Sequence, residues 1–300
     1  MKVVPELQQF IQRNQLNSDY LAHAEQWFGP IIAQLYRQSL LTKSPLIIGF
    51  NGCQGSGKST LADYFGTSLN AEYGLNVAVL SLDDFYYSQQ QRKELADQIH
   101  PLLATRGVPG THDINLAINT LDRLCAGPTN EDPVALPRFN KFNDNPHPER
   151  EWPVINQHLD VIVLEGWCLG AQPQPTNALI YPVNKLEATQ DKQGIWRSYV
   201  NQQLKQNYQA FFNRIDFWLM LKAPDFNHVH QWRLEQESKM EQLQYDLSVD
   251  ITVDKIMTSN EVKQFIAYFQ RITEHCLSNL PTRCDWVFQL DDKRHIVAMK

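Results

Sequence analysis

The sequence lacks any long hydrophobic run. Nowhere do about eighteen apolar residues occur together, as a membrane-spanning helix requires, and the most apolar strings, at residues 46–48 and 161–164, have the length of strands. We therefore expect no contact with a membrane. Residues 1–6 turn polar at once, so we expect no export signal either.

Cysteine is scarce, and basic residues are not in excess. The five cysteines are odd in number and form no Cys-x-x-Cys pair, which predicts reduced thiols in a cytoplasmic protein and argues against zinc. The chain has 27 Lys and Arg against 33 Asp and Glu, a net charge of −6, which argues against a nucleic-acid partner. Any phosphate chemistry must therefore use a local positive site.

The remaining composition is that of an ordinary globular chain, with 43% hydrophobic and 20% charged residues. Short, mostly apolar runs without strict alternation favour a parallel sheet that is covered on both faces. We expect strands at residues 46–50, 77–82, 160–164, 215–221 and 285–290. Because helix-length segments separate these runs, the pattern predicts an α/β fold with three layers, α/β/α, around a mainly parallel five-stranded sheet.

Apolar stripes at helical spacing predict the covering helices. One helix is expected from residue 114 behind an Asp113 N-cap, and another over residues 262–272 behind Ser259 or Asn260. A third apolar stripe comprises Trp196, Val200, Leu204, Tyr208 and Phe212. We expect residues 1–44 to form a helical N-terminal extension and residues 45–300 to form the main domain. The docking face of the extension is predicted to consist of Phe28, Ile31, Ile32 and Leu35.

The strongest local signal follows the first predicted strand. Residues 52–59 match the pattern Gly-x-x-x-x-Gly-Lys-Ser of a phosphate-binding loop, the P-loop, between a strand and a helix. Glycines allow a tight turn whose backbone N–H groups converge on a phosphate, and the helix N-terminus adds a positive dipole end. Lys58 would reach the β- and γ-phosphates, Ser59 would bind Mg²⁺, and Thr60 would contact the α-phosphate. The predicted nucleotide-binding residues are Gly52, Cys53, Gln54, Gly55, Ser56, Gly57, Lys58, Ser59 and Thr60.

Acidic residues end two further predicted strands. Asp83 and Asp84 follow the run at 77–82, and Glu165 follows residues 161–164. Carboxylates at the C-terminal ends of parallel strands face the ligand crevice of an open α/β sheet. One member of the Asp pair is expected to point inward and to accept the proton of an acceptor alcohol, and Glu165 is expected to hold Mg²⁺.

These motifs resemble those of the P-loop small-molecule kinases that include uridine kinase, phosphoribulokinase and pantothenate kinase. The resemblance is closest to the D-glycerate 3-kinase family, and it extends from about residue 44 to the end of the chain. It rests on residues 52–60, 81–86, 106–113 (Arg-Gly-Val-Pro-Gly-Thr-His-Asp), 136–139, 165–167 and 232–234. The resemblance implies that Asp83 is the base and that Asp83 and Tyr86 contact the substrate. One departure is Asn140, where the family usually has Asp.

D-Glycerate carries a carboxylate, so its site needs cations and hydrogen-bond donors. Arg106, His112, Arg138 and Lys141 supply such groups, and the two arginines can grip a carboxylate with two hydrogen bonds. Arg233, on a helix expected to begin near Asp225, is a candidate for stabilising charge on the transferred phosphoryl group.

The resulting hypothesis is a kinase that uses ATP and Mg²⁺ to phosphorylate a small hydroxy acid, D-glycerate, with Lys58, Asp83, Glu165 and Arg233 as catalytic residues. Two alternatives stay open: a kinase of the uridine or pantothenate type, and a non-catalytic nucleotide-binding module. A GTPase is disfavoured because Asn140-Lys141 and Asn184-Lys185 are not followed by the Asp of its base-reading motif. The sequence carries no signal for an oligomeric state.

Overall fold

The structure is a computed structural model that describes residues 4–17, 19–247 and 257–300. Residues 1–3, part of the polar start considered above, lie outside the described residues. No helix in the described part is both long and apolar enough to cross a lipid bilayer.

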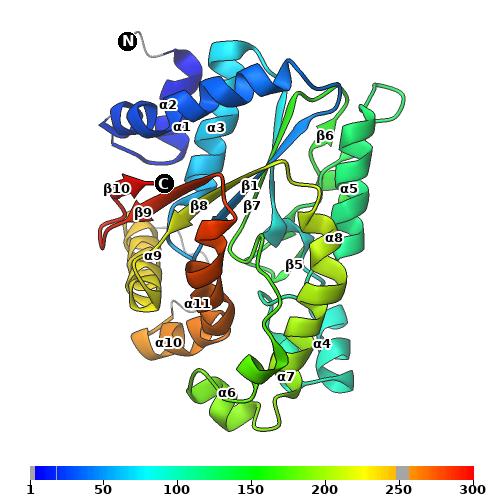
Figure 1. The fold of residues 1–300 in the computed structure, drawn as a ribbon, viewed down its shortest axis with the longest axis vertical. Coiled ribbons are helices and arrows are strands. Elements are labelled where there is room, and N and C mark those ends of the chain that lie inside the picture. The colour runs from blue at the N-terminus through cyan, green and yellow to red at the C-terminus, as the bar shows by residue number, and fades with distance from the viewer. Residues whose placement is uncertain (1–3, 18, 248–256) are drawn as a thin grey trace.

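A six-stranded sheet crosses the centre of the described chain, in the order β10-β9-β8-β1-β7-β2 (Figure 1). The strands are β1 (Leu46–Gly52), β2 (Val77–Ser81), β7 (Val161–Gly166), β8 (Phe217–Lys222), β9 (Trp286–Leu290) and β10 (Ile296–Met299). The first five run parallel to one another, so the predicted strands and their direction are confirmed. Strand β10 runs antiparallel to β9 and is a half-exposed edge strand that no buried apolar run predicts.

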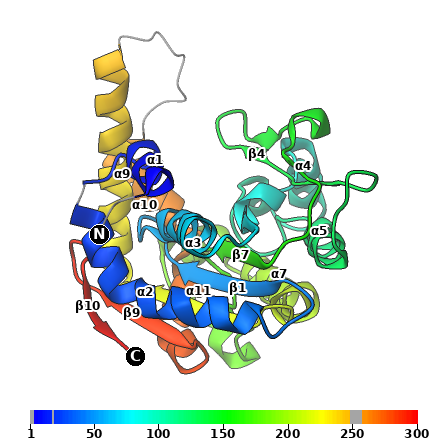
Figure 2. The same cartoon turned by 90° about the horizontal axis from the view of Figure 1, so that it is seen from above.

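Helices cover both faces of the sheet, and each face has its own hydrophobic cluster (Figures 1 and 2). One face is covered by α1 (Pro5–Arg13), α2 (Asp19–Ser39), α3 (Lys58–Tyr73) and the start of α9 (Phe226–Leu247). The other is covered by α5 (Ile114–Ala126), α7 (Ile195–Gln203), α8 (Gln209–Phe212) and α11 (Gln270–Asn279). Odd and even positions of β1 face opposite clusters, as for Ile47 and Ile48, which is why the run reads as continuously apolar.

The N-terminal helices are part of the main core. The four predicted docking residues of α2 are all buried. The ring of Phe28 lies 4.8 Å from that of Phe288 on β9 and 5.7 Å from that of Phe65 on α3, measured between centroids. The extension therefore shares one hydrophobic cluster with the sheet, and the division at residues 44 and 45 stays a prediction.

Helix caps follow the side chains that can accept backbone hydrogen bonds. Asp113 caps α5 as predicted, because its carboxylate accepts from the amide of Leu116. The predicted cap at Ser259 or Asn260 is wrong. Thr258 caps α10 (Ser259–Ala267) in a capping box with Glu261, and α11 begins separately after Phe269.

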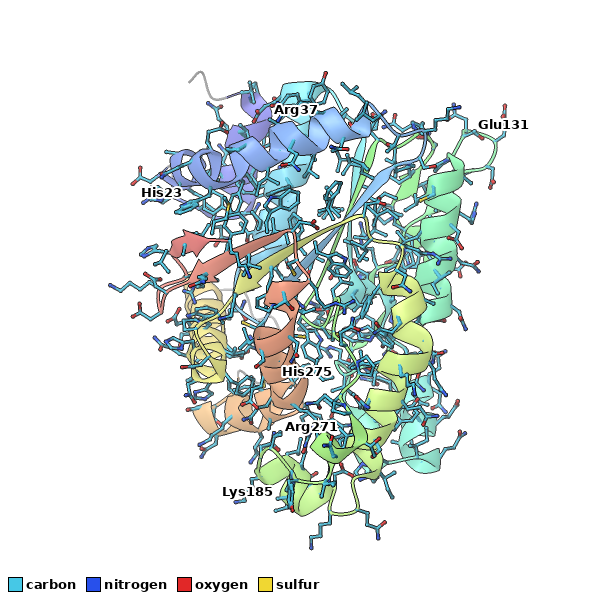
Figure 3. The ribbon with its side chains drawn as sticks, in the orientation of Figure 1. His23, Arg37, Glu131, Lys185, Arg271 and His275 are labelled. Atoms are coloured by element: carbon cyan, nitrogen blue, oxygen red, sulfur yellow. The ribbon has the colours of Figure 1, made fainter. Side chains whose placement is uncertain are left out.

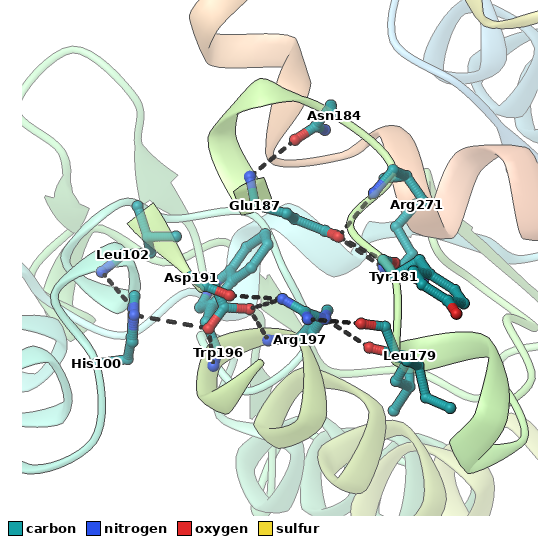
Figure 4. Close-up of polar contacts among 12 residues, drawn as sticks. His100, Leu102, Leu179, Tyr181, Asn184, Glu187, Asp191, Trp196, Arg197 and Arg271 are labelled. Atoms are coloured by element: carbon teal, nitrogen blue, oxygen red, sulfur yellow. Dashed lines mark hydrogen bonds and ion pairs between the residues drawn. The ribbon is translucent and has the colours of Figure 1, made fainter. Parts of the chain in front are cut away.

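The helix that carries the Trp196–Phe212 stripe contains an irregular turn. A π-helical turn, η5 (Leu204–Tyr208), joins α7 to α8, and all five stripe residues are buried. The chain before α7 is fixed by two buried ion pairs, Arg197 with Asp191 at 2.9 Å and Arg271 with Glu187 at 2.6 Å (Figure 4). Arg271 reaches from α11 to Glu187 on α6 (Lys185–Gln190), so these pairs fix the base of α7 (Figure 3).

In Figure 2, α3 and β7 lie between α9 and a second group of elements. It includes α4 (Gln89–Gln98) and two small antiparallel pairs, β3 (Val134–Ala135) with β6 (Val154–Ile155) and β4 (Phe139–Asn140) with β5 (Asn145–Pro146). The loop after α5 carries Glu131 at its outer end (Figure 3). Short 3₁₀ turns complete the chain: η1 (Leu82–Phe85), η2 (Pro101–Ala104), η3 (Glu149–Glu151), η4 (Thr176–Leu179) and η6 (Leu280–Thr282).

Candidate active site

The predicted phosphate loop lies between the end of β1 and the start of α3. Gly55 and Gly57 have φ angles of 76° and 89°, in the left-handed region that favours glycine. A Cβ on Gly55 would also lie 2.7 Å from the Cβ of Trp232, so α9 packs directly against the loop. Gly57 and Ser59 are exposed, so the start of α3 is open to a ligand.

The residues expected to hold Mg²⁺ lie in contact. Ser59 Oγ donates a hydrogen bond of 2.8 Å to Glu165 Oε1 at the end of β7, and Lys58 Nζ lies 3.8 Å from Glu165 Oε2. Glu165 is 6% exposed, and its Oε2 has no hydrogen-bond partner among the described residues. A buried carboxylate oxygen without a donor is typical of a position that a ligand completes.

Asp83 and Asp84 lie in the turn η1 after β2, and not in an extended strand as their spacing suggests. Asp83 Oδ1 accepts from the Tyr86 hydroxyl at 2.9 Å, and its Oδ2 accepts from Lys141 Nζ at 2.6 Å. Burial alone would raise the pKa of Asp83, but the charges of Lys141 and Lys58 outweigh it and hold this pKa well below its ordinary value. Asp83 is therefore ionised at neutral pH.

Asp84 has different partners. Its Oδ1 accepts from the backbone amide of Phe139 at 3.1 Å, and its Oδ2 lies 3.3 Å from Arg138 Nη1. Burial raises the pKa of Asp84, and the guanidinium of Arg138 opposes this only in part. Asp84 therefore ties η1 to β4, and Asp83 is the carboxylate whose pKa the charge of Lys58 lowers.

The turn between β4 and β5 carries Lys141 and is held by Asp144, which the sequence pattern does not single out. Asp144 pairs with Arg92 Nη2 on α4 at 2.5 Å and also with Arg106. The guanidinium of Arg106 lies 5.6 Å from the centroid of the Phe139 ring. Arg106 thus supports this turn. Only the N–H groups of Arg106 that these contacts leave free can bind a ligand.

Tyr86 and His112 form the wall beside Asp83. Their rings stack at 4.3 Å between centroids and 25° between planes. His112 is 2% exposed, and its Nδ1 lies 2.6 Å from the hydroxyl of Tyr208. Burial lowers the pKa of His112 to about 3, so its ring is neutral.

Arg233 is placed apart from these groups. Within the described chain it pairs with Glu237, one turn further along α9, and its guanidinium lies 5.8 Å from the centroid of the Phe265 ring. Burial lowers the pKa of Arg233, and the positive charge of Arg106 adds to this effect. The neighbouring Trp232 touches the phosphate loop, so Arg233 is near the loop but turned to Glu237.

The structure therefore gathers most of the predicted site residues into two groups of contacts. Lys58 and Ser59 contact Glu165. Tyr86 and Lys141 contact Asp83, His112 stacks on Tyr86, and Arg138 contacts the neighbouring Asp84. Two residues beside them lie outside the motifs. Tyr208 counts in the sequence only as one member of an apolar stripe, and Asp144 falls in a loop. Neither position carries a local signal, because their partners lie 96 and 52 residues away.

Several known kinases are similar in sequence to this chain. No protein-family model matches the chain. The chain is 30% identical over 239 residues to the probable ATP-dependent kinase TDA10 of Saccharomyces cerevisiae, covering 72% of this chain and 77% of that protein. It is 33% identical over 207 residues to the chloroplastic D-glycerate 3-kinase of Arabidopsis thaliana, covering 66% of this chain and 42% of the plant protein.

A solved structure agrees on the fold. D-Glycerate 3-kinase from Cryptococcus neoformans var. grubii matches with a TM-score of 0.72 and 24% identity, over 92% of this chain and 98% of that one. The phosphate loop, the acids at the ends of β2 and β7 and these similarities lead to one conclusion. The chain is a P-loop kinase and belongs to the family that includes D-glycerate 3-kinase and TDA10.

Proposed function

We propose that this kinase transfers the γ-phosphoryl group of ATP to a hydroxyl of D-glycerate and forms 3-phosphoglycerate. The observation that carries the proposal is the position of Asp83, which accepts hydrogen bonds from Lys141 and Tyr86 and whose pKa is held low by the charges of Lys141 and Lys58. The similarity to the plant D-glycerate 3-kinase supports this choice of acceptor.

The phosphate loop binds and orients ATP. Backbone N–H groups of residues 52–59 and the N-terminus of α3 favour negative charge, and Lys58 adds a full positive charge for the β- and γ-phosphates. The buried Gln54 Oε1 and Ser56 Oγ have no hydrogen-bond partner in the described chain. Cys53 is buried as well, and burial raises the pKa of its thiol to about 12, so it stays protonated.

Ser59 and Glu165 fit a bound Mg²⁺. The described residues hold no cluster of three or more His, Cys, Asp or Glu side chains that could bind a metal, but Mg²⁺ in kinases uses one or two protein oxygens together with phosphates and waters. The 2.8 Å contact between Ser59 and Glu165 and the unpartnered Oε2 supply such oxygens. When bound, the ion would offset charge on the phosphates.

Asp83 orients the acceptor alcohol and takes its proton. An ionised carboxylate offers about four lone-pair positions, and Tyr86 and Lys141 use one on each oxygen. The acceptor hydroxyl can therefore donate to Asp83 while both contacts persist. As the new O–P bond forms and the bond to ADP breaks, the proton passes to Asp83.

The cations beside Asp83 suit an acid as the acceptor. The Lys141 side chain is 60% exposed and donates a hydrogen bond to Asp83 from one of its three N–H groups, which leaves two for a ligand. Arg138, 31% exposed, can contribute a second contact to a carboxylate. A nucleoside offers no carboxylate to these groups.

The acceptor is identified by measuring ADP release with ATP, Mg²⁺ and a panel of D-glycerate, L-glycerate, glycerol, uridine, pantothenate and ribulose 5-phosphate. We expect turnover with D-glycerate, little with glycerol because it lacks the carboxylate, and none when EDTA removes Mg²⁺. Turnover with uridine or pantothenate in place of D-glycerate would overturn the choice of acceptor, while a chain that releases no ADP with any of them would leave only nucleotide binding.

A further inference from the structure

Tyr208 touches neither the phosphate loop nor Asp83, yet it contacts a residue of the acceptor site. We propose that Tyr208 is a positioning residue that keeps His112 in its Nε2–H tautomer, so that His112 donates a hydrogen bond to an oxygen of the acceptor beside Asp83. This inference rests on the proposed function for the presence of an acceptor, and not on the acceptor being D-glycerate.

The tautomer follows from the hydrogen bonds of the Tyr208 hydroxyl. Its oxygen accepts from the backbone amide of Gly110 at 2.9 Å and lies 2.6 Å from His112 Nδ1. The described chain offers the hydroxyl proton no acceptor other than His112 Nδ1, so the hydroxyl donates to that nitrogen. A neutral imidazole that accepts at Nδ1 carries its hydrogen on Nε2.

Both partners are neutral, so the assignment does not depend on pH near neutrality. Burial raises the pKa of Tyr208 well above its ordinary value and lowers the pKa of His112 to about 3. The negative charge of Asp83 opposes the second shift but does not cancel it. The pair is therefore a phenol and an imidazole, and not an ion pair.

The Nε2–H group is a donor without a partner. His112 is 98% buried, given its 2% exposure, and its Nε2 has no hydrogen-bond partner within the described residues. A buried donor that lacks a partner costs free energy, and an oxygen of a bound molecule would remove this cost. The Tyr86 ring stacks on the imidazole, and the Tyr86 hydroxyl donates to Asp83, so a single side chain links His112 to the base.

The irregular turn in the helix explains how Tyr208 reaches this position. It is the last residue of the π-helical turn η5, it is fully buried, and its ring meets that of His112 edge to face at 5.8 Å. Single π-helical turns occur frequently at functional sites because they rotate one side chain out of the regular helical spacing. The buried pairs at the base of α7 hold this helix in place (Figure 4).

The tautomer is tested on the free enzyme by ¹⁵N NMR of the imidazole nitrogens. We expect the His112 signals of the wild type to show a protonated Nε2 and an unprotonated Nδ1, and Tyr208→Phe to give a mixture of tautomers. Protonation of Nδ1, or a mixture in the wild type, would overturn the inference. The His112→Gln variant assigns the signals by their loss.

The effect on the acceptor is tested by steady-state kinetics, with D-glycerate or whichever panel member the wild type phosphorylates. Tyr208→Phe should raise the KM for the acceptor about tenfold, the size of one lost hydrogen bond, and leave the KM for ATP unchanged. In His112→Gln the amide N–H groups can donate whether or not Tyr208 keeps its hydroxyl. Adding Tyr208→Phe to His112→Gln should therefore change the KM for the acceptor little further. Equal effects in both backgrounds, or an equal rise in the KM for ATP, would mean that Tyr208 acts only in folding.

A matched control removes a different buried tyrosine hydroxyl. Tyr64 is 1% exposed and belongs to the hydrophobic cluster on the opposite face of the sheet, so Tyr64→Phe should leave the KM for the acceptor unchanged. The role of Tyr208 and the choice of D-glycerate as acceptor can each be overturned without the other. A wrong tautomer overturns the role of Tyr208 and leaves the kinase activity intact, whereas absence of D-glycerate turnover overturns the acceptor and leaves the tautomer as measured.

Discussion

Asp83 and Asp84 are adjacent, and their surroundings give them different roles. The charges of Lys141 and Lys58 keep Asp83 ionised, and each of its oxygens can still accept another hydrogen bond. Asp84 accepts from the backbone of β4, and burial raises its pKa. The sequence alone cannot distinguish the two carboxylates, because the difference comes from partners that the fold brings from distant parts of the chain.

Replacing Asp83 with Asn tests its assignment as the base. The amide keeps the size of the side chain but cannot take a proton, so we expect Asp83→Asn to lower kcat by a factor of about 10² to 10⁴ with little change in ATP binding. Rapid-quench or steady-state assays with a separate measurement of nucleotide binding would show this. Asp97→Asn, at an exposed position on α4, is the control and should match the wild type. An unchanged kcat in Asp83→Asn would remove the assignment.

At the scale of elements, the turn between β4 and β5 is fixed by one carboxylate. Asp144 lies at a φ of 52°, a conformation that Asp tolerates better than most residues, and binds Arg92 of α4 together with Arg106. The Arg92 side chain is 0% exposed, so Asp144 supplies the counter-charge to a buried guanidinium. This turn carries Lys141, and the ion pairs therefore fix the position of Lys141 relative to Asp83.

We expect Asp144→Asn to destabilise the protein by about 3 kcal/mol at pH 7, because it leaves a buried guanidinium without its counter-charge. Burial would raise the pKa of Asp144, but Arg92 and Arg106 outweigh it and lower that pKa. The stabilisation is therefore complete at neutral pH and is lost as the pH falls below about 4. Thermal melts at pH 7 and pH 3.5 should show the difference between variant and wild type shrinking at the lower pH.

An exposed ion pair provides the control for this prediction. Asp132 bonds Arg123 at 2.7 Å, but the two side chains are 82% and 51% exposed. Asp132→Asn should therefore change the melting temperature little at either pH. A loss of stability in Asp144→Asn that stays the same at both pH values would contradict the ion-pair explanation.

At the scale of the whole molecule, the N-terminal helices complete one face of the sheet. Phe28 is 4% exposed and packs on rings of α3 and β9, far from it in sequence. A separate unit would need its own core, but the buried side chains of α1 and α2 lie in the cluster of the sheet. We therefore expect the extension and the sheet to unfold together.

Phe28→Ala tests this expectation. Removal of a buried phenylalanine costs about 3–5 kcal/mol, and we predict one cooperative unfolding transition at a lower temperature by calorimetry. His23→Ala, at an exposed position on the same helix, should melt like the wild type. Two transitions, with the main one unmoved, would instead show that residues 1–44 fold independently.

Local patterns determined much of this protein. The phosphate loop, the five parallel strands and the Asp113 cap follow from neighbouring residues, because a turn, a strand or a cap is set by side chains a few positions apart. The edge strand β10 is short and half exposed, and the cap at Thr258 precedes the positions that the apolar stripe favours. Strand β10 is decided by its pairing with β9, whereas the cap at Thr258 is set locally by its capping box with Glu261.

The tertiary structure alone decided which charges meet. Lys141 with Asp83, Asp144 with Arg92, and Tyr208 with His112 join residues 58, 52 and 96 positions apart. The sequence supplied the phosphate loop and the acids that follow two strands, since these depend on local chain geometry. The ionisation of Asp83 and the free donor of His112 depend on burial and on distant partners, and only the folded chain provides these.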